Sequence, residues 1–173
     1  RTSGTGQDLF GTRFAGTRFY AVGEAQTVLG STDGQSWSLQ TNAISSLRDI
    51  AFGGVPGIYV AVGASGIPVF SENGLEWFAL PDTSLTGLNG VIYEAGRFYA
   101  VGDGGVIWRS LNGESWSSLN SGVSTNLQDI TYSNGILVAV GQNTIVTSDN
   151  GGNTWTVYTF AEDSLALNGV AGT

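Results

Sequence analysis

Short apolar runs rich in Val, Ile, Tyr and Phe recur along the chain, and clusters of Gly, Asn, Asp and Ser separate them. Such runs are typical of β-strands, because branched and aromatic side chains pack well on a pleated surface. The runs follow one another in a repeated order. Each repeat opens with a leucine string (LFGTRF at 9, LRDIAF at 47, LNGVIY at 88, LQDITY at 127) and continues with a glycine-ended string (FYAVG at 19, YVAVG at 59, FYAVG at 98, LVAVG at 137).

A third string in each repeat begins with serine and ends with tryptophan. Its central Asp-Gly or Asn-Gly pair suits a tight hairpin, because both residue types tolerate positive φ. We expect the serine hydroxyl and the Asp or Asn side chain to bind backbone amides within the turn, and the tryptophan to fill the gap to the next module. We therefore assign the motif a structural role. Its residues are Ser31, Asp33, Trp37, Ser71, Asn73, Trp77, Ser110, Asn112, Trp116, Ser148, Asn150 and Trp155.

The tryptophans of this motif lie 40, 39 and 39 residues apart. A period near 40 with four strands in each unit is typical of a β-propeller blade. One blade cannot bury both of its faces alone, so neighbouring blades must pack together. The sequence therefore predicts a single all-β domain over 1–173, a β-propeller of four four-stranded antiparallel blades. The predicted blades cover about 9–46, 47–87, 88–126 and 127–166, and an extra inner strand covers 167–173.

The closure of the ring stays open at this point. The string LNGV at 167 repeats the start of the third copy, so two segments compete for one inner position. Gly11 and Gly90 stand where the second and fourth copies have Asp49 and Asp129, which indicates a duplicated two-blade unit. The alternatives are a compact four-bladed ring, a chain that continues into further blades, and two chains that close an eight-bladed ring. An unpaired inner edge is an association site, so residues 167–173 are a candidate surface for a homo-oligomer.

The serine–tryptophan strings resemble the Asp-box, or bacterial neuraminidase repeat, with the pattern Ser-x-Asp-x-Gly-x-Thr-Trp. The last copy fits best, through Ser148, Asn150, Gly152, Thr154 and Trp155. The wider pattern resembles secreted bacterial propellers and photosystem II assembly-factor propellers. The resemblance implies that the motifs lie on the blade periphery, away from the functional face. It also implies a secreted or otherwise extracytoplasmic location, in a fold that serves sialidases, other glycosidases, receptors and non-catalytic scaffolds.

Composition narrows the chemistry. The 173 residues include no Cys and no His, and all six basic residues are arginines, which excludes thiol nucleophiles, imidazole bases, Schiff-base lysines and the usual zinc ligands. The net charge of -8 disfavours nucleic acid as a partner. The chain has no continuous apolar stretch of membrane-spanning length, so we expect no membrane insertion.

The candidate binding face is the one formed by the loops between repeats and by the connections that follow each Val-Ala-Val-Gly or Tyr-Ala-Val-Gly string. Its candidate ligand-binding residues are Arg48, Asp49, Asp103, Gln128 and Asp129. Asp49 and Asp129 recur near the start of inner strands, where carboxylates can bind calcium or act as an acid and base pair. The alternative, which we favour, is that each carboxylate accepts backbone hydrogen bonds. We therefore expect no metal and no cofactor, with calcium as the alternative.

Three classes of function remain. The first is a non-catalytic binding or assembly module that takes a protein or carbohydrate ligand on its loop face. The second is a structural subunit that assembles by exchange of its terminal strand, and the third is a fragment of a sialidase-like glycoside hydrolase. In the sialidases that the fold resembles, three inward arginines hold the substrate. Arg48 is the arginine whose position faces the channel, so we expect no enzyme activity, and we expect Trp108 to pack between blades.

Overall fold

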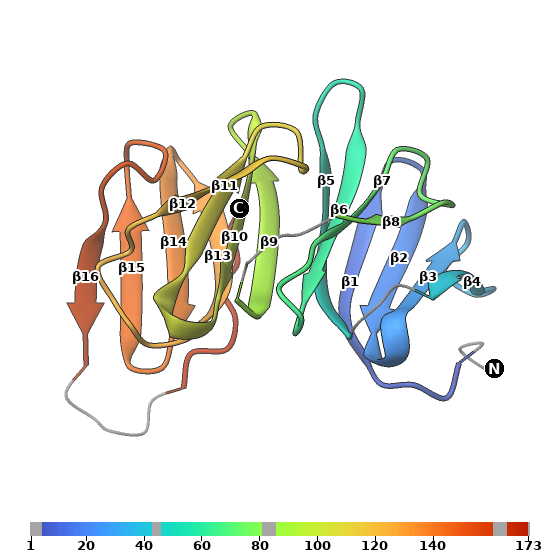
Figure 1. The fold of residues 1–173 in the computed structure, drawn as a ribbon, viewed down its shortest axis with the longest axis horizontal. Coiled ribbons are helices and arrows are strands. Elements are labelled where there is room, and N and C mark those ends of the chain that lie inside the picture. Colours follow the sequence, from blue (N-terminus) through green and yellow to red (C-terminus); the bar gives the residue numbers. More distant parts are fainter. Residues whose placement is uncertain (1–4, 43–45, 81–85, 161–165, 173) are drawn as a thin grey trace.

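The computed structural model describes residues 5–42, 46–80, 86–160 and 166–172. Within these residues the chain forms four four-stranded antiparallel sheets, each with its strands in sequence order (Figure 1). The predicted all-β architecture of four blades is thereby confirmed. We call the sheets blades 1 to 4 in chain order.

The blades share one plan, in which the first strand is the leucine string and the second is the glycine-ended string. Blade 1 consists of β1 (Leu9–Ala15), β2 (Arg18–Gly23), the short helix η1 (Glu24–Gln26), β3 (Thr27–Ser31) and β4 (Ser38–Asn42). Blade 2 consists of β5 (Leu47–Gly53), β6 (Ile58–Gly63), β7 (Val69–Ser71) and β8 (Phe78–Ala79). Blade 3 consists of β9 (Leu88–Glu94), β10 (Arg97–Gly102), the short helix η2 (Asp103–Gly105), β11 (Ile107–Ser110) and β12 (Trp116–Leu119). Blade 4 consists of β13 (Leu127–Ser133), β14 (Ile136–Gly141), β15 (Thr144–Ser148) and β16 (Thr156–Thr159).

No helix in the described ranges has the length and apolar character needed to cross a membrane.

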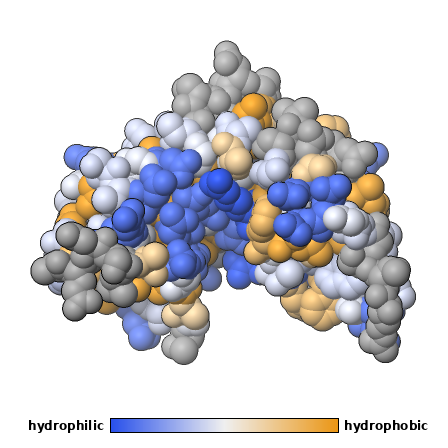
Figure 2. All heavy atoms as spheres, turned by 90° about the horizontal axis from the view of Figure 1, so that it is seen from below, coloured by the Kyte–Doolittle hydropathy of each residue, from blue (hydrophilic) through white to orange (hydrophobic). Residues whose placement is uncertain are grey.

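The inner strands β1, β5, β9 and β13 lie next to one another in this order. Packing joins β1 to β5, β5 to β9, and β9 to β13, whereas no comparable packing joins β13 back to β1 within the described residues. Figure 2 looks along the strands from below and shows a crescent with a hollow between its two arms. The four blades therefore form an open row, which fits part of a larger ring better than a compact four-bladed ring.

An apolar cluster fills each contact between consecutive blades. Tyr20 of blade 1 packs with Ile50 and Tyr59 of blade 2. Trp77 joins this cluster, and its ring centroid lies 6.3 Å from that of Tyr20. Equivalent clusters join blades 2 and 3, where Trp116 packs, and blades 3 and 4, where Trp155 packs. Trp108 belongs to the cluster between blades 2 and 3, as expected.

The turn tryptophans of blades 2 to 4, Trp77, Trp116 and Trp155, pack against the preceding blade, so the expectation that each fills the gap to the next blade has the wrong direction. The reason is the position of the turn itself, which lies over the second strand of the blade before it. A Cβ added to Gly74 would lie 1.9 Å from the Tyr20 hydroxyl oxygen, and one added to Gly113 would lie 2.6 Å from a methyl carbon of Val60. The turn glycine thus allows a close contact between blades as well as a tight turn.

Side-chain hydrogen bonds hold each of these turns. The Gly74 N–H donates to Ser71 Oγ over 2.8 Å, and the N–H groups of Leu75 and Glu76 donate to Asn73 Oδ1 over 2.8 and 2.9 Å. The other three turns repeat this pattern, with small variations in the last. In the first turn, donation from the Ser36 and Gln35 N–H groups and the Ser31 hydroxyl lowers the pKa of Asp33 to about 2. These contacts support the structural role assigned to the motif.

Two aspartates bind the backbone of the segment beside their own inner strand, which is β9 for Asp49 and residues 167–172 for Asp129. Asp49 Oδ1 accepts from the Ile50 N–H, and Asp49 Oδ2 accepts from the Val91 N–H of blade 3, both over 2.8 Å. Asp129 repeats this arrangement with its own neighbour Ile130 and with Val170, again over 2.8 Å. Residues 167–172 thus lie against blade 4 as β9 lies against blade 2. The predicted extra inner strand is not formed in the described residues 167–172, and the neighbouring Ala166 makes an isolated bridge with Gln142.

Glycines lie opposite the aspartates. A Cβ added to Gly11 would lie 3.1 Å from the Asp49 Cα, and one added to Gly90 would lie 3.2 Å from the Asp129 Cα. A side chain at either glycine would therefore push its strand away from the aspartate-bearing neighbour. The alternation of Gly and Asp along the row of inner strands is a steric match between adjacent blades.

The glycine that ends each second strand makes the closest backbone approach in the blade. A Cβ added to Gly102 would lie 2.0 Å from the Gly87 carbonyl oxygen, and the same distance holds at Gly23, Gly63 and Gly141 with their own carbonyls. Directly after Gly102, the Asp103 N–H donates to that Gly87 oxygen over 2.9 Å. The glycine therefore lets the second strand bind the residue just before the first strand.

Gly102→Ala is expected to lower the free energy of unfolding by about 2 to 3 kcal/mol, because the added methyl overlaps a backbone oxygen that has no room to move. The φ of Gly102 is -170°, which alanine adopts freely, so the loss comes from the close approach. Urea denaturation measures the effect. Gly6→Ala is the control, because nothing lies within 4 Å of its added Cβ. Equal stability of the two variants would contradict the assigned contact.

Asp49 is expected to make stability depend on pH. Burial raises its pKa to about 6, although hydrogen bonds from the Val91 and Ile50 N–H groups oppose the rise. The folded state therefore holds a proton that the unfolded chain has already lost between about pH 4 and 6, and stability falls as pH rises through this window. Relative to Asp49→Asn, the wild-type chain should lose about 2 kcal/mol from pH 4 to 6.5. Denaturant titrations at each pH measure this, with the exposed Glu72→Gln as control, and parallel wild-type and Asp49→Asn curves would refute it.

Candidate functional site

Each inner strand carries a β-bulge at its second residue. In blade 3, Leu88 pairs with Gly102 and Gly90 pairs with Val101, so Asn89 has no partner across the ladder. The same register shift occurs at the second residue of β1, β5 and β13. A bulge bends the strand and redirects a side chain. We call the residues that follow the first leucine of each copy the axial residues: Phe10, Arg48, Asn89, Gln128 and Asn168.

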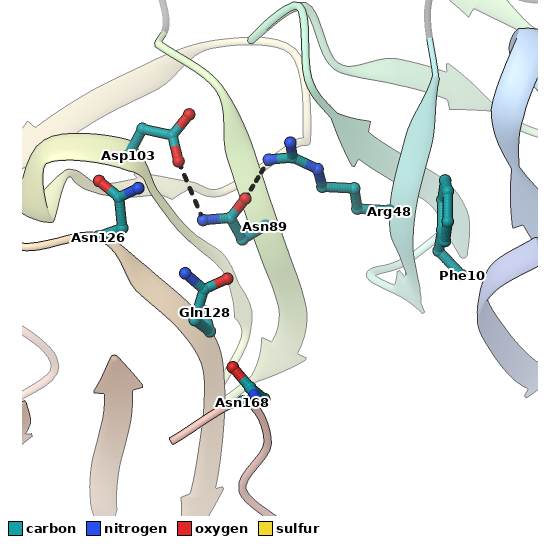
Figure 3. Close-up of a pocket in the computed structure, with 7 residues that line it drawn as sticks. All are labelled: Phe10, Arg48, Asn89, Asp103, Asn126, Gln128 and Asn168. Atoms are coloured by element: carbon teal, nitrogen blue, oxygen red, sulfur yellow. Dashed lines mark hydrogen bonds between the residues drawn. The ribbon is translucent and has the colours of Figure 1, made fainter. Parts of the chain in front are cut away.

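The axial residues line one pocket. It has a volume of about 430 Å³, and its lining is completed by Asp103 and Asn126. Figure 2 shows hydrophilic side chains gathered at the middle of the crescent, beside the hollow, on the side where the inner strands begin. The close-up in Figure 3 shows these residues arriving from different blades toward a common space. The repeat thus produces a polar site from residues that are far apart in the sequence.

A hydrogen-bond relay crosses the pocket (Figure 3). Arg48 Nη1 donates to Asn89 Oδ1, and Asn89 Nδ2 donates to Asp103 Oδ1 over 3.3 Å and to the Leu127 carbonyl over 2.7 Å. Blades 2, 3 and 4 are therefore joined through one amide. A neutral amide separates the positive group from the negative one, so the pocket presents a cation at one end and a carboxylate at the other.

The Asp103 and Asn126 side chains are positioned by a braced loop. The Gly104 N–H donates to Asn126 Oδ1 over 2.9 Å, which ties η2 to the segment before β13. The buried Ser121 hydroxyl donates to the Gly105 carbonyl over 2.6 Å and binds the same segment a second time. Gly104 and Gly105 have φ values of 69° and 76°, a region that favours glycine. The wall of the pocket on blade 3 is therefore preorganised.

The structure brings three predicted site residues together, namely Arg48, Asp103 and Gln128. Asp49 and Asp129 do not line this pocket, because each follows the bulge and turns toward the next inner strand, where backbone amides occupy both carboxylate oxygens. No group of three or more carboxylates capable of holding a metal gathers among the residues that the structure describes. The loops between repeats that were candidates for the binding face lie at 41–46, 81–87, 121–126 and 161–166. The structure describes 121–126 in full, and its last residue, Asn126, lines the pocket, whereas residues 43–45, 81–85 and 161–165 lie outside the described residues.

Sequence reasoning missed three lining residues, Phe10, Asn89 and Asn168, and included Asn126 only as the last residue of the candidate loop 121–126. The signal for the three was present in the repeat, because each follows the first leucine of its copy. Asn126 had no comparable signal, since it enters through the loop that contacts η2.

The pocket is suited to binding neutral polar groups. Side-chain amides come from Asn89, Asn126, Gln128 and Asn168, and each offers both donors and an acceptor. Asp103 is the one carboxylate among the lining residues. Glycoside hydrolysis ordinarily needs two carboxylates on either side of the bond that breaks. The lining therefore offers side-chain amides for hydrogen bonding to a polar ligand and supplies one carboxylate.

No protein-family model and no curated protein sequence matches the chain. Its fold is nevertheless similar to solved β-propellers. YCF48 from Cyanidioschyzon merolae is 18% identical with a TM-score of 0.69, and the match covers 91% of this chain and 58% of that one. A structure of YCF48 bound to D1 peptide is 21% identical with a TM-score of 0.70, covering 88% and 55%.

An ancestral GH74 enzyme is also similar, at 18% identity and a TM-score of 0.70, and the match covers 89% of this chain and 24% of the enzyme. The chain thus spans a little over half the length of the two YCF48 structures. Similarity at this level of identity establishes the fold and leaves the function to the site. The four blades are those of a β-propeller.

Proposed function

We propose that the chain is a non-catalytic module that binds an extended peptide segment of a protein partner in the axial pocket and serves in assembly. The observation that carries this proposal is the relay of Arg48, Asn89 and Asp103, which places a cation, fixed amides and a carboxylate along one polar wall. An extended peptide exposes alternating N–H and C=O groups, which side-chain amides bind in pairs. The structurally similar YCF48, which was solved bound to D1 peptide, supports a peptide as the class of ligand.

The surroundings of the pocket also favour a peptide. Exposed Phe10 lies at one end and offers an apolar contact for a side chain, whereas Gln128 and Asn168 offer amides beyond Asn89. The net charge of -8 makes a neutral or basic segment the better match over the surface as a whole, with Arg48 as the local site for a carboxylate or a carbonyl. The resemblance to secreted propellers supports an extracytoplasmic location as part of this proposal.

A glycan-active role has one supporting observation, the similarity to the GH74 fold. The pocket opposes it, because its lining supplies one carboxylate, which Asn89 already holds by a hydrogen bond. We therefore propose binding without turnover for any carbohydrate ligand as well.

Arg48→Ala is expected to weaken peptide binding roughly tenfold to a hundredfold, because a hydrogen bond to a charged group contributes about 1.5 to 3 kcal/mol. The probe is a displayed library of random linear peptides, followed by calorimetry with the selected sequences as synthetic peptides. Arg97→Ala is the matched control, since it removes the same charge from a separate hollow lined by blade 3 residues.

Equal affinity of the Arg48→Ala and Arg97→Ala variants would remove the axial pocket from the proposal. A selection that yields no peptide, together with binding to a panel of oligosaccharides, would replace the peptide by a glycan. Release of reducing sugar from that panel would overturn the non-catalytic assignment.

A further inference from the structure

The two ends of the row of blades present opposite faces of the same repeating interface. We call the face that a blade turns toward the preceding blade its leading face, and the opposite face its trailing face. Blades 2, 3 and 4 each bury a leading face against the trailing face of the blade before it. The leading face of blade 1 and the trailing face of blade 4 have no such partner within the described residues. The chain therefore carries one of each kind.

The leading face of blade 1 exposes residues that the other blades bury. Leu9 is 39% exposed, whereas the equivalent leucines at 47, 88 and 127 are 1%, 0% and 0% exposed. Phe19 is 38% exposed, whereas its equivalents Tyr59, Phe98 and Leu137 are 7%, 0% and 1% exposed. The turn glycine Gly34 is likewise exposed, whereas the turns of the other blades bury theirs. Figure 2 shows hydrophobic side chains on the right-hand arm of the crescent, which blade 1 forms.

The leading face of blade 1 contains a hollow as well as exposed apolar side chains. A hollow of about 420 Å³ lies between Phe14, Phe19, Gly34 and Trp37. In the internal interfaces, the matching space beside the turn glycine receives a residue from the second strand of the preceding blade, Tyr20 at Gly74 and Val60 at Gly113. The residue at the corresponding position of blade 4 is Val138, which is partly exposed.

The trailing end of blade 4 holds a short substitute for a neighbour. Val170 donates its N–H to Asp129 Oδ2 over 2.8 Å, as Val91 does to Asp49. Thr12 stands at the same position in blade 1, because it lies opposite Ala21 as Val91 lies opposite Ala100. The N–H of Thr12 therefore fits the acceptor that Val170 now occupies.

We infer that the trailing face of blade 4 docks onto the leading face of blade 1 of a second copy of this chain, and that β1 of that copy displaces residues 167–172. The Gly and Asp alternation continues across such a junction, because Asp129 then faces Gly11 of the second copy as it now faces Gly169. Two identical junctions close a ring of eight blades, within the range of known propellers. The inference does not depend on the proposed peptide ligand.

The second copy also changes the pocket. Phe10 of the second copy takes the place of Asn168, and Arg48 of the second copy becomes the next axial residue after that Phe10. The half-ring of axial residues becomes a full ring, and the amide of Asn168 is exchanged for an aromatic side chain. The pocket of the single chain is thus incomplete on its open side.

Sedimentation equilibrium of the full chain over a wide range of concentration tests the inference. We expect the average mass to rise with protein concentration from that of one 18.0 kDa chain to that of two chains. Phe19→Glu should weaken association at least roughly a hundredfold, because it buries an unpaired charge in the junction. Leu111→Glu is the matched control, since Leu111 is 69% exposed and lies outside both end faces. Circular dichroism checks that both variants remain folded.

The Val170→Pro variant distinguishes two models. In one, β1 of the second copy displaces residues 167–172, and in the other, residues 167–172 themselves bind the second copy. Proline has no N–H for Asp129, so the substitution loosens the segment that competes with β1 and should tighten association roughly tenfold. Weaker association of Val170→Pro would mean that the terminal segment itself makes the junction, which overturns the displacement. A mass of one chain at every concentration for both wild type and Val170→Pro, or association that Phe19→Glu leaves unchanged, would overturn the dimer.

Discussion

The contact between the last glycine of each second strand and the carbonyl before each first strand organises the whole molecule. Because Gly102 lets the backbones approach this closely, Asp103 binds the Gly87 carbonyl and the ladder skips one residue, Asn89. That skipped residue is the one that faces the pocket. One steric condition, met in every blade, thus fixes the register of the sheet and places a side chain at the centre of the molecule.

Packing between blades extends this local rule. Blades 2 to 4 each pack an apolar leading face, completed by a tryptophan, against the blade before them, and their turn glycines allow this close contact. The contacts are nearly the same at each junction, so stability accumulates from neighbour to neighbour along the row, as in other repeat proteins. Asp49 and Asp129 add a directional bond at alternate junctions, and the glycines opposite them keep the strands close.

The fold could be predicted from the sequence because the same three strings occur in all four repeats, so each copy supports the assignment of the others. The leucine strings, the glycine-ended strings and the serine–tryptophan turns each correspond to strands or turns that follow from local preference and period. The site was harder, because its position depends on the bulge. A regular strand turns adjacent residues to opposite faces, so Arg48 and Asp49, both named as candidates, cannot both face the axis, and the bulge places Arg48 in the pocket while Asp49 binds Val91. The direction of Trp77 was missed for a similar reason, since a repeat shows that blades pack but not on which side the turn folds.

The alternation of Gly and Asp along the inner strands limits how such an array can change its size during evolution. Recombination that inserts or removes a single blade would set two aspartate-bearing strands, or two glycine-bearing strands, side by side. The first juxtaposition crowds two carboxylates, and the second removes the bond that Val91 makes with Asp49. Gain or loss of a pair of blades avoids both defects. Lineages carrying this motif are therefore expected to change blade number in even steps.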